Sequence, residues 1–148
     1  MLSDCHMHTR FSLDSDAEPE EMIKSGIEKG LDAVCITDHE DHDYISEGNE
    51  WTFDVEQYFA CMSELREKYC GRIPVRIGAE IGLQPHLREY YRNYVRQKPF
   101  DFIIGSVHLI KSRDPYYKEF FEERSDAVAY EETFEETYEN IRNVEDFD

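Results

Sequence analysis

Segments with the hydrophobic periodicity of a β-strand alternate along this chain with segments that have the periodicity of an α-helix. Strand-like segments cover residues 2–8, 32–37, 73–81 and 100–108. Each is followed by a region with apolar residues three or four positions apart, which predicts helices over 17–30, 54–71, 87–97 and 126–143. Pro19 near the start of the first helix, and Gly30 and Gly71 at the ends of the first two, support these boundaries.

Four strand–helix pairs in strict alternation are typical of parallel α/β architecture. The length of 148 residues fits one domain. A closed barrel of such pairs needs ~200 residues or more, so four pairs make about half of one. The sequence therefore predicts either a small open sheet or part of a larger domain. The last helix carries an apolar stripe along one side, and we expect its aromatic members Tyr130, Phe134 and Tyr138 to lie in the core. The whole stripe consists of Val128, Tyr130, Phe134, Tyr138 and Ile141.

The charge balance limits the partners that the protein can have. It has 34 acidic and 16 basic residues, a formal net charge of -18, which repels nucleic-acid backbones and anionic membrane surfaces. We therefore expect neither as a partner, and a phosphate ligand only where metal ions supply positive charge. Four widely spaced cysteines, no secretory signal at the start and no long apolar run together predict a cytoplasmic protein. The sequence does not indicate an oligomeric state.

Histidines and carboxylates occur where the predicted strands end. His6 and His8 alternate on the first strand, so both imidazoles share a face and can reach one ion. Asp38 and His39 follow the second strand. A lone His-x-His pair is more often structural than metal-binding, so the interpretation depends on the other strands.

The third and fourth strands add to this pattern. Glu80 lies in an apolar strand, where an unpaired carboxylate would be costly, and His108 ends the fourth. The carboxyl ends of parallel strands meet at one rim, so we expect these side chains to lie close together. Nitrogen and oxygen ligands without cysteine suit Zn, Mn or Fe. The sequence therefore predicts a site for divalent metal ions.

Six stretches together resemble a known family. They are "DCHMHTRFSLDS", "ITDH", "RIGAEIGLQPH", "FDFIIGSVH", "DPYYKEFFEERS" and "AYEETFEETYENI". They resemble the polymerase-and-histidinol-phosphatase (PHP) superfamily, and the last two favour its histidinol-phosphate phosphatase branch. The resemblance implies a distorted (β/α)7 TIM-like barrel, of which this chain supplies the first four or so β/α units. Residues 1–148 are then a PHP metal-dependent phosphoesterase domain truncated at its C-terminus.

The resemblance also implies two or three divalent metal ions. His6 and His8 would hold the first ion, Glu80 would bridge the first and second, and His108 would bind the second. Asp14 and His39 would bind the third. Glu80, His108 and His39 are expected to be the catalytic residues. Family members continue further and supply a later histidine and an Asp-x-His, which this chain does not contain.

The activity implied by the resemblance is hydrolysis of L-histidinol phosphate to L-histidinol and phosphate, in histidine biosynthesis. The residues themselves support metal-dependent hydrolysis of a small phosphate ester, because a bound ion lowers the pKa of water to about 7. Two alternatives stay open. One is a PHP phosphoesterase acting on nucleotides or other phosphate esters, and the other is an inactive metal-binding fragment that lacks the C-terminal ligands.

Three residues are weaker candidates. Asp38 either orients a ligand imidazole or caps the end of a strand. His86, in "GLQPH", faces either substrate or solvent. Arg113, in "KSRDPYY", contacts either a phosphate or carboxylate of the substrate or only the surface.

Overall fold

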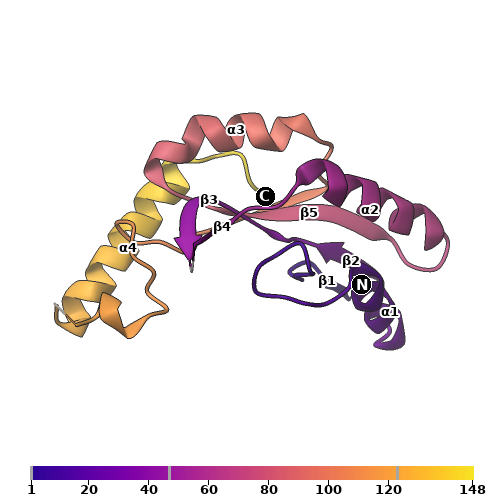
Figure 1. Cartoon of the computed structure of the whole chain (residues 1–148), viewed down its shortest axis with the longest axis horizontal. Coiled ribbons are helices and arrows are strands. Elements are labelled where there is room, and N and C mark those ends of the chain that lie inside the picture. Colours follow the sequence, from indigo (N-terminus) through magenta and orange to yellow (C-terminus); the bar gives the residue numbers. More distant parts are fainter. Residues whose placement is uncertain (1, 47, 123) are drawn as a thin grey trace.

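The computed structural model describes residues 2–46, 48–122 and 124–148 and shows a mixed α/β fold around a twisted sheet (Figure 1). The strands are β1 (Ser3–Asp4), β2 (Ala33–Ile36), β3 (His39–Ser46), β4 (Asn49–Trp51), β5 (Val75–Gly82) and β6 (Phe102–Ser106). The α-helices are α1 (Pro19–Glu28), α2 (Val55–Lys68), α3 (Arg88–Gln97) and α4 (Asp126–Asn143). Two 3-10 turns, η1 (Pro85–Leu87) and η2 (Lys118–Phe120), complete the described elements.

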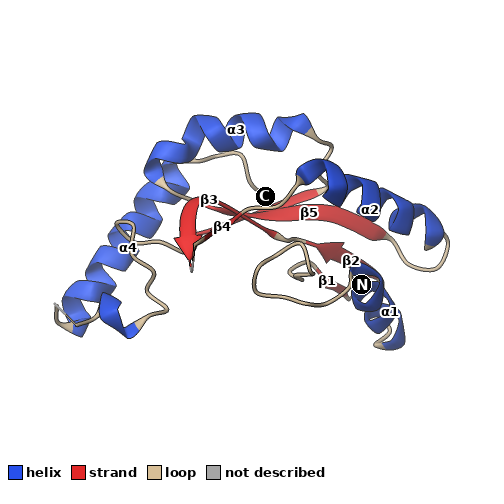
Figure 2. Ribbon diagram, viewed as in Figure 1, coloured by secondary structure: helices blue, strands red, loops and turns tan. Residues whose placement is uncertain are grey.

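The main part of the sheet is parallel, as the sequence predicts, and β5 lies at its centre. β2 and then β3 pair with one side of β5, β6 pairs with the other, and β1 pairs with β2. His39 at the start of β3 is directly opposite Glu80 on β5. All these strands run in the same direction, so their carboxyl ends point toward one rim (Figure 2).

One prediction about the strands is wrong. The alternation of strands and helices is not strict, because β3 and β4 form an antiparallel hairpin between β2 and α2. The segment "HEDHDYIS" is too polar to resemble a strand. It nevertheless forms β3, which pairs with β5 further along the same edge that β2 occupies. The first strand is also shorter than expected, with only Ser3 and Asp4 in the ladder.

Two helices pack their apolar faces against the sheet and anchor it through tyrosine hydroxyls. Tyr58 on α2 is fully buried and donates hydrogen bonds to the carbonyls of Ile36 and Gly78, both at 2.9 Å. Tyr91 on α3 is fully buried and donates to the carbonyls of Glu40 and Gly82, at 3.0 and 2.9 Å. These bonds satisfy buried backbone groups, and they tie β2 to β5 through Tyr58 and β3 to β5 through Tyr91.

Helix α4 has the predicted bounds, but its predicted core face is wrong. All five residues of the apolar stripe are exposed, from Val128 at 44% to Phe134 at 70%. The opposite side packs on the domain instead, with Ala129 and Asn140 fully buried, and Asn140 donates to the Leu83 carbonyl at 3.2 Å. Small and polar residues permit this close approach, whereas the bulky stripe would hold the helix further away. Figure 1 shows α4 at the opposite end of the molecule from α1.

Among the described residues, no helix combines the length and the apolar character that crossing a bilayer requires.

Candidate metal centre

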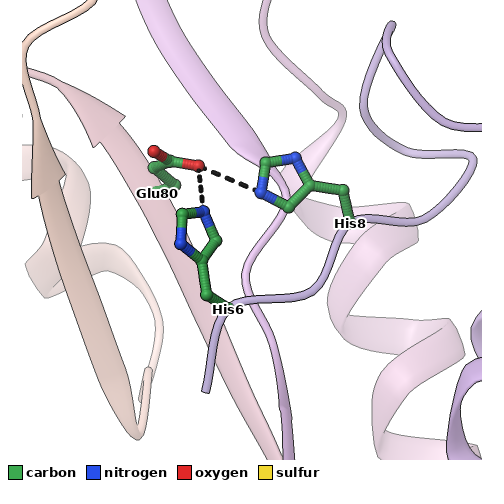
Figure 3. Close-up of side chains that lie close together, drawn as sticks. All are labelled: His6, His8 and Glu80. Carbon is green, nitrogen blue, oxygen red and sulfur yellow. Dashed lines mark hydrogen bonds and ion pairs between the residues drawn. The ribbon is translucent and has the colours of Figure 1, made fainter. Parts of the chain in front are cut away.

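The carboxylate of Glu80 lies at the centre of the candidate site. Its side chain is only 3% exposed, and its Oε2 lies 2.9 Å from Nε2 of His6 and 3.1 Å from Nε2 of His8. Figure 3 shows both rings pointing at this oxygen. Nε2 of His39 lies 3.7 Å from the same oxygen, and Nε2 of His108 lies 3.2 Å from Oε1. Four imidazoles therefore surround one buried carboxylate.

The fold explains how residues so far apart in sequence meet. His6 and His8 follow β1, His39 begins β3, and His108 follows β6. His6 and His8 lie beyond the carboxyl end of β1, His39 lies beyond that of β2, and His108 lies beyond that of β6. β2 and β6 pair directly with β5, and β1 is one strand further away. The C-terminal rim of parallel α/β sheets is where active sites are usually built.

Asp14 lies next to the cluster of Glu80 and the four imidazoles, in the loop between β1 and α1. Its Oδ2 lies 3.3 Å from Nδ1 of His8 and 3.6 Å from Nε2 of His39. The rings of His8 and His39 meet edge to face, with centroids 4.3 Å apart. This carboxylate therefore extends the site on the side away from His6.

Asp38 fixes the loop that carries Asp14. It is fully buried and accepts hydrogen bonds from the backbone N–H of Thr9 at 2.5 Å and from the hydroxyls of Thr9 and Ser12, both at 2.8 Å. Ser12 Oγ in turn accepts a bond from the His39 N–H at 2.8 Å. Asp38 thus holds the loop against the start of β3, and its bonded partners are not imidazoles.

Asp41 makes the contacts with imidazoles that the sequence left open for Asp38. Its Oδ2 lies 2.8 Å from Nδ1 of His39, and its Oδ1 lies 2.6 Å from Nδ1 of His108. The side chain is only 2% exposed. Through Nδ1, Asp41 turns the Nε2 atoms of both rings toward Glu80. The signal in the sequence was the spacing in "HED", which puts His39 and Asp41 on the same face of a strand.

Hydrogen bonds between Glu80 and the histidines shift the pKa values of both toward their charged forms. Burial raises the pKa of Glu80, but hydrogen bonds with His108, His8 and Ser106 outweigh it and hold that pKa far below its usual range. Burial lowers the pKa of His108, yet its bonds with Asp41 and Glu80 raise the value to about 10. The hydrogen bond with Glu80 also raises the pKa of His8. The site thus favours positive charge beside Glu80.

The donor atoms also fit divalent metal ions. Around Glu80 there are three groups of three residues, and some residues belong to more than one group. Within each group, one ligand atom from each residue lies within 4.8 Å of the other two. The groups are His6, His8 and Glu80; His8, Asp14 and His39; and His39, Glu80 and His108. Imidazole nitrogens and carboxylate oxygens are the ligands of Zn and of similar ions. These residues can therefore hold divalent metal.

A cavity of about 590 Å³ opens beside the centre and is lined in part by Asp14, His39 and His108. Arg113 does not line this cavity. It is exposed and lines a separate hollow of about 610 Å³, which shares Asp114 and Tyr117 with the first.

His42 and His86 lie apart from the Glu80 cluster. His86 contacts Asp43, with Nε2 3.0 Å from Oδ2, and is largely exposed. His42 stacks on Tyr90 and lies 3.1 Å from Glu50. With Asp43 and Glu50, His42 forms a separate group of possible ligands on the outer part of the hairpin.

Comparison with known proteins places the chain in a family. The model of the PHP domain matches residues 4–145. The chain therefore belongs to the PHP domain family.

Several curated relatives of the chain are named histidinol-phosphatase or probable histidinol-phosphatase. The chain is 28% identical over 145 residues to the histidinol-phosphatase of Lactococcus lactis, covering 97% of this chain and 53% of that protein. It is 33% identical over 134 residues to a probable histidinol-phosphatase of Clostridium acetobutylicum, covering 90% and 50%. The chain thus spans about half the length of the curated relatives that it matches.

A solved structure shows the same fold. The histidinol phosphate phosphatase of Lactococcus lactis, crystallised with zinc, L-histidinol and phosphate, has a TM-score of 0.93 and 27% identity. The match covers 99% of this chain and 56% of that one. The mixed α/β fold with a parallel sheet is therefore shared with a histidinol phosphatase.

Proposed function

We propose that this chain forms the metal-binding half of a phosphomonoesterase that hydrolyses L-histidinol phosphate to L-histidinol and phosphate. The observation that carries the proposal is the buried Glu80 carboxylate with four imidazoles directed at it. The relatives named histidinol-phosphatase, and the zinc, L-histidinol and phosphate bound in one of them, support this substrate.

The proposed metal sites follow the three groups of donor atoms. His6, His8 and Glu80 would hold one ion, and Glu80 and His108 would hold a second. Asp14 and His39 would hold a third. The centre then contains two or three ions of Zn, Mn or Fe, with Zn supported by the relative's complex. Such ions activate water as a nucleophile and neutralise charge on phosphoryl oxygens.

The residues of the chain supply position and charge. Glu80 and Asp41 fix the histidine rings from opposite sides, since they contact the Nε2 and Nδ1 atoms of His108, respectively. His39, Glu80 and His108 border the point where the ester would lie and are the proposed catalytic residues. The phosphate of a small ester is the group that this centre would hold.

The proposed architecture of the complete domain is a distorted (β/α)7 barrel. The parallel strands β1, β2, β5 and β6 are neighbours in chain order, as consecutive barrel units would be. Residues 1–148 then provide the first four or so units, in one PHP domain. We also propose that the protein is cytoplasmic, and that neither nucleic acid nor membrane is its partner.

The test is zinc-dependent release of phosphate by the purified chain. We expect L-histidinol phosphate to be hydrolysed faster than nucleotides and sugar phosphates, and Glu80→Gln to abolish the reaction. Glu119→Gln, away from the centre, is the matched control and should retain activity. Equal turnover of other monoesters would favour a different PHP phosphoesterase. No turnover by a chain that still binds zinc would favour an inactive metal-binding fragment that lacks the C-terminal ligands.

A further inference from the structure

A further group of possible metal ligands lies on the β3–β4 hairpin and shares no member with the three groups around Glu80. It consists of His42, Asp43 and Glu50, whose ligand atoms lie within 4.8 Å of one another. Nδ1 of His42 lies 3.1 Å from Oε1 of Glu50, and its Nε2 lies 3.8 Å from Oδ1 of Asp43. Ligands about 2.0–2.2 Å from a tetrahedral ion lie about 3.3–3.6 Å from each other. Rotations of these partly exposed side chains are therefore enough to bring all three onto one ion.

A bulge in β3 brings these side chains together. In a regular strand, consecutive side chains point to opposite faces, so His42 and Asp43 would be separated. Here Asp41 and Ile45 pair with two neighbouring residues of β4, so the three residues between them have no counterpart on that strand. Within the bulge, Asp43 has a φ of 61°, in the left-handed region that residues other than glycine rarely adopt. Bulges redirect side chains, and this one leaves both His42 and Asp43 within reach of Glu50.

Contacts on several sides fix the ring and the backbone of His42. The ring stacks on Tyr90, with centroids 3.9 Å apart and planes 7° from parallel, and the Tyr90 hydroxyl donates to the buried Glu40 carboxylate at 2.8 Å. The backbone N–H of His42 donates to the Tyr91 hydroxyl oxygen at 3.2 Å, and its carbonyl accepts from Gln84 at 3.0 Å. A side chain that its neighbours already hold loses little freedom when it binds a ligand.

His86 orients the carboxylate of Asp43. Nε2 of His86 lies 3.0 Å from Oδ2 of Asp43, whereas Oδ1 of the same carboxylate faces His42. Hydrogen bonds from residues outside the ligand set commonly orient carboxylates that bind metal. The contact also links the η1 turn, which carries His86, to the hairpin.

The charge of this group favours a cation. Between described residues, every ion pair of Asp43 and Glu50 is with a histidine, and none is with a lysine or arginine. Neutral imidazole, the form that binds metal, leaves both negative charges uncompensated. His42 and Glu50 also line a hollow of about 370 Å³, which leaves room for the water that completes a site with three protein ligands. Nitrogen and oxygen ligands of this kind suit zinc and similar ions.

We propose that His42, Asp43 and Glu50 bind zinc or a similar divalent ion at a site separate from the Glu80 centre, and that this ion holds β3 and β4 together. Two of the ligands come from β3 and one from β4, so the ion connects the strands across the bulge. Trp51 follows Glu50, and its ring edge meets His39 with centroids 5.1 Å apart. The ion therefore also fixes the part of the hairpin that lies next to the Glu80 centre. This inference concerns ion binding and does not depend on the proposed activity.

The test compares bound zinc in the parent and in Asp43→Asn/Glu50→Gln, by elemental analysis after dialysis at a micromolar free zinc concentration. Asparagine tolerates the left-handed backbone at position 43, and glutamine at position 50 can still accept from the backbone N–H of that residue. We expect the variant to bind about one ion fewer. Its affinity at this site should fall by more than about 100-fold, because changes outside the ligand set alone cost 10- to 100-fold.

Glu119→Gln/Asp126→Asn is the matched control, because it removes two negative charges at exposed positions that belong to no group of possible ligands among the described residues. It should bind as much zinc as the parent. His42→Gln, which removes a single ligand by a different substitution, should show the same loss of about one ion. Circular dichroism without zinc checks that each variant keeps the fold.

Glu80→Gln separates the two sites. If they are independent, adding Asp43→Asn/Glu50→Gln to Glu80→Gln should remove about one further ion. Hydrogen exchange read by mass spectrometry then locates the ion, since zinc should slow exchange over residues 42–51 in the parent and in Glu80→Gln, but not in Asp43→Asn/Glu50→Gln. The inference is overturned if His42→Gln and Asp43→Asn/Glu50→Gln both bind as much zinc as the parent. It is also overturned if the combined variant binds as many ions as Glu80→Gln alone. Release of phosphate is not measured in this test, so its outcome and that of the proposed function are separate.

Discussion

A Cβ atom at position 82 would lie 1.8 Å from Oδ1 of Asp41. Gly82 on β5 therefore leaves the space in which the Asp41 carboxylate reaches His39 and His108. A glycine that the sequence shows only as part of "IGAEIG" is thus a steric requirement of the proposed centre.

Gly82→Ala should destabilise the metal-free chain by about 1–3 kcal/mol, because Asp41 is buried and held at both oxygens and has to move. Urea unfolding measures the loss. Asp41→Ala removes the atoms that would clash, so the double variant should lose clearly less stability than the sum of the single variants. Additive losses would show that the two residues do not interact.

Asp41→Asn should weaken zinc binding by about 10- to 100-fold, since an amide cannot accept from both Nδ1 atoms at once. Competition with a zinc chelator measures the affinity. Asp126→Asn, at an exposed position in the first turn of α4 and in none of the groups of possible ligands found among the described residues, is the matched control and should bind zinc like the parent. An affinity for zinc that is equal in the two variants would exclude a positioning role for Asp41.

The exposed stripe of α4 should contribute little to stability in this chain. Phe134→Ala is expected to change the free energy of unfolding by less than about 0.5 kcal/mol, because the side chain is 70% exposed. Met62→Ala, in the fully buried face of α2, should cost about 2–5 kcal/mol. A comparable loss from both would mean that the stripe packs in a core, as the sequence predicted.

The ionisation of Glu20 should make the stability of the folded chain depend on pH in acidic solution. Its hydrogen bonds with Lys68 and Tyr69 lower its pKa to about 2, from about 4.3 in an unfolded chain. The folded state therefore gains stability above the unfolded value and loses it as pH falls from 4.3 toward 2. The melting temperature of Glu20→Gln should lie below that of the parent at pH 7 and approach it near pH 2. Glu21→Gln, which removes the exposed ion pair with Lys24, should show a smaller difference.

Local patterns predicted much of the fold. The bounds of α2 and α4 and the parallel pairing of β2, β5 and β6 follow from apolar spacing and from the order of elements. The β3–β4 hairpin could not be predicted in this way, because its polar residues are satisfied by tertiary contacts rather than by an apolar face. The spacing of α4 revealed a stripe, but not that the smaller residues opposite it would pack on the domain.

The candidate site was partly predictable for a similar reason. Parallel strands bring their carboxyl ends together, so the meeting of His6, His8, His39 and His108 around Glu80 could be expected from order alone. The order of the elements does not predict whether Asp38 or Asp41 is the partner of the imidazoles. The choice depends on the register of β3 against β5 and on the space at Gly82, which only the tertiary structure provides.

The most direct test of the proposed metal centre is the number of zinc ions bound per chain, measured by elemental analysis after dialysis, for the parent and for Glu80→Gln. Because Glu80 lies between the proposed ligands of two ions, we expect at least two ions in the parent and the loss of at least one in the variant. Glu119→Gln should match the parent. Less than one ion in the parent, or equal zinc content in the parent and Glu80→Gln, would contradict the metal centre proposed around Glu80.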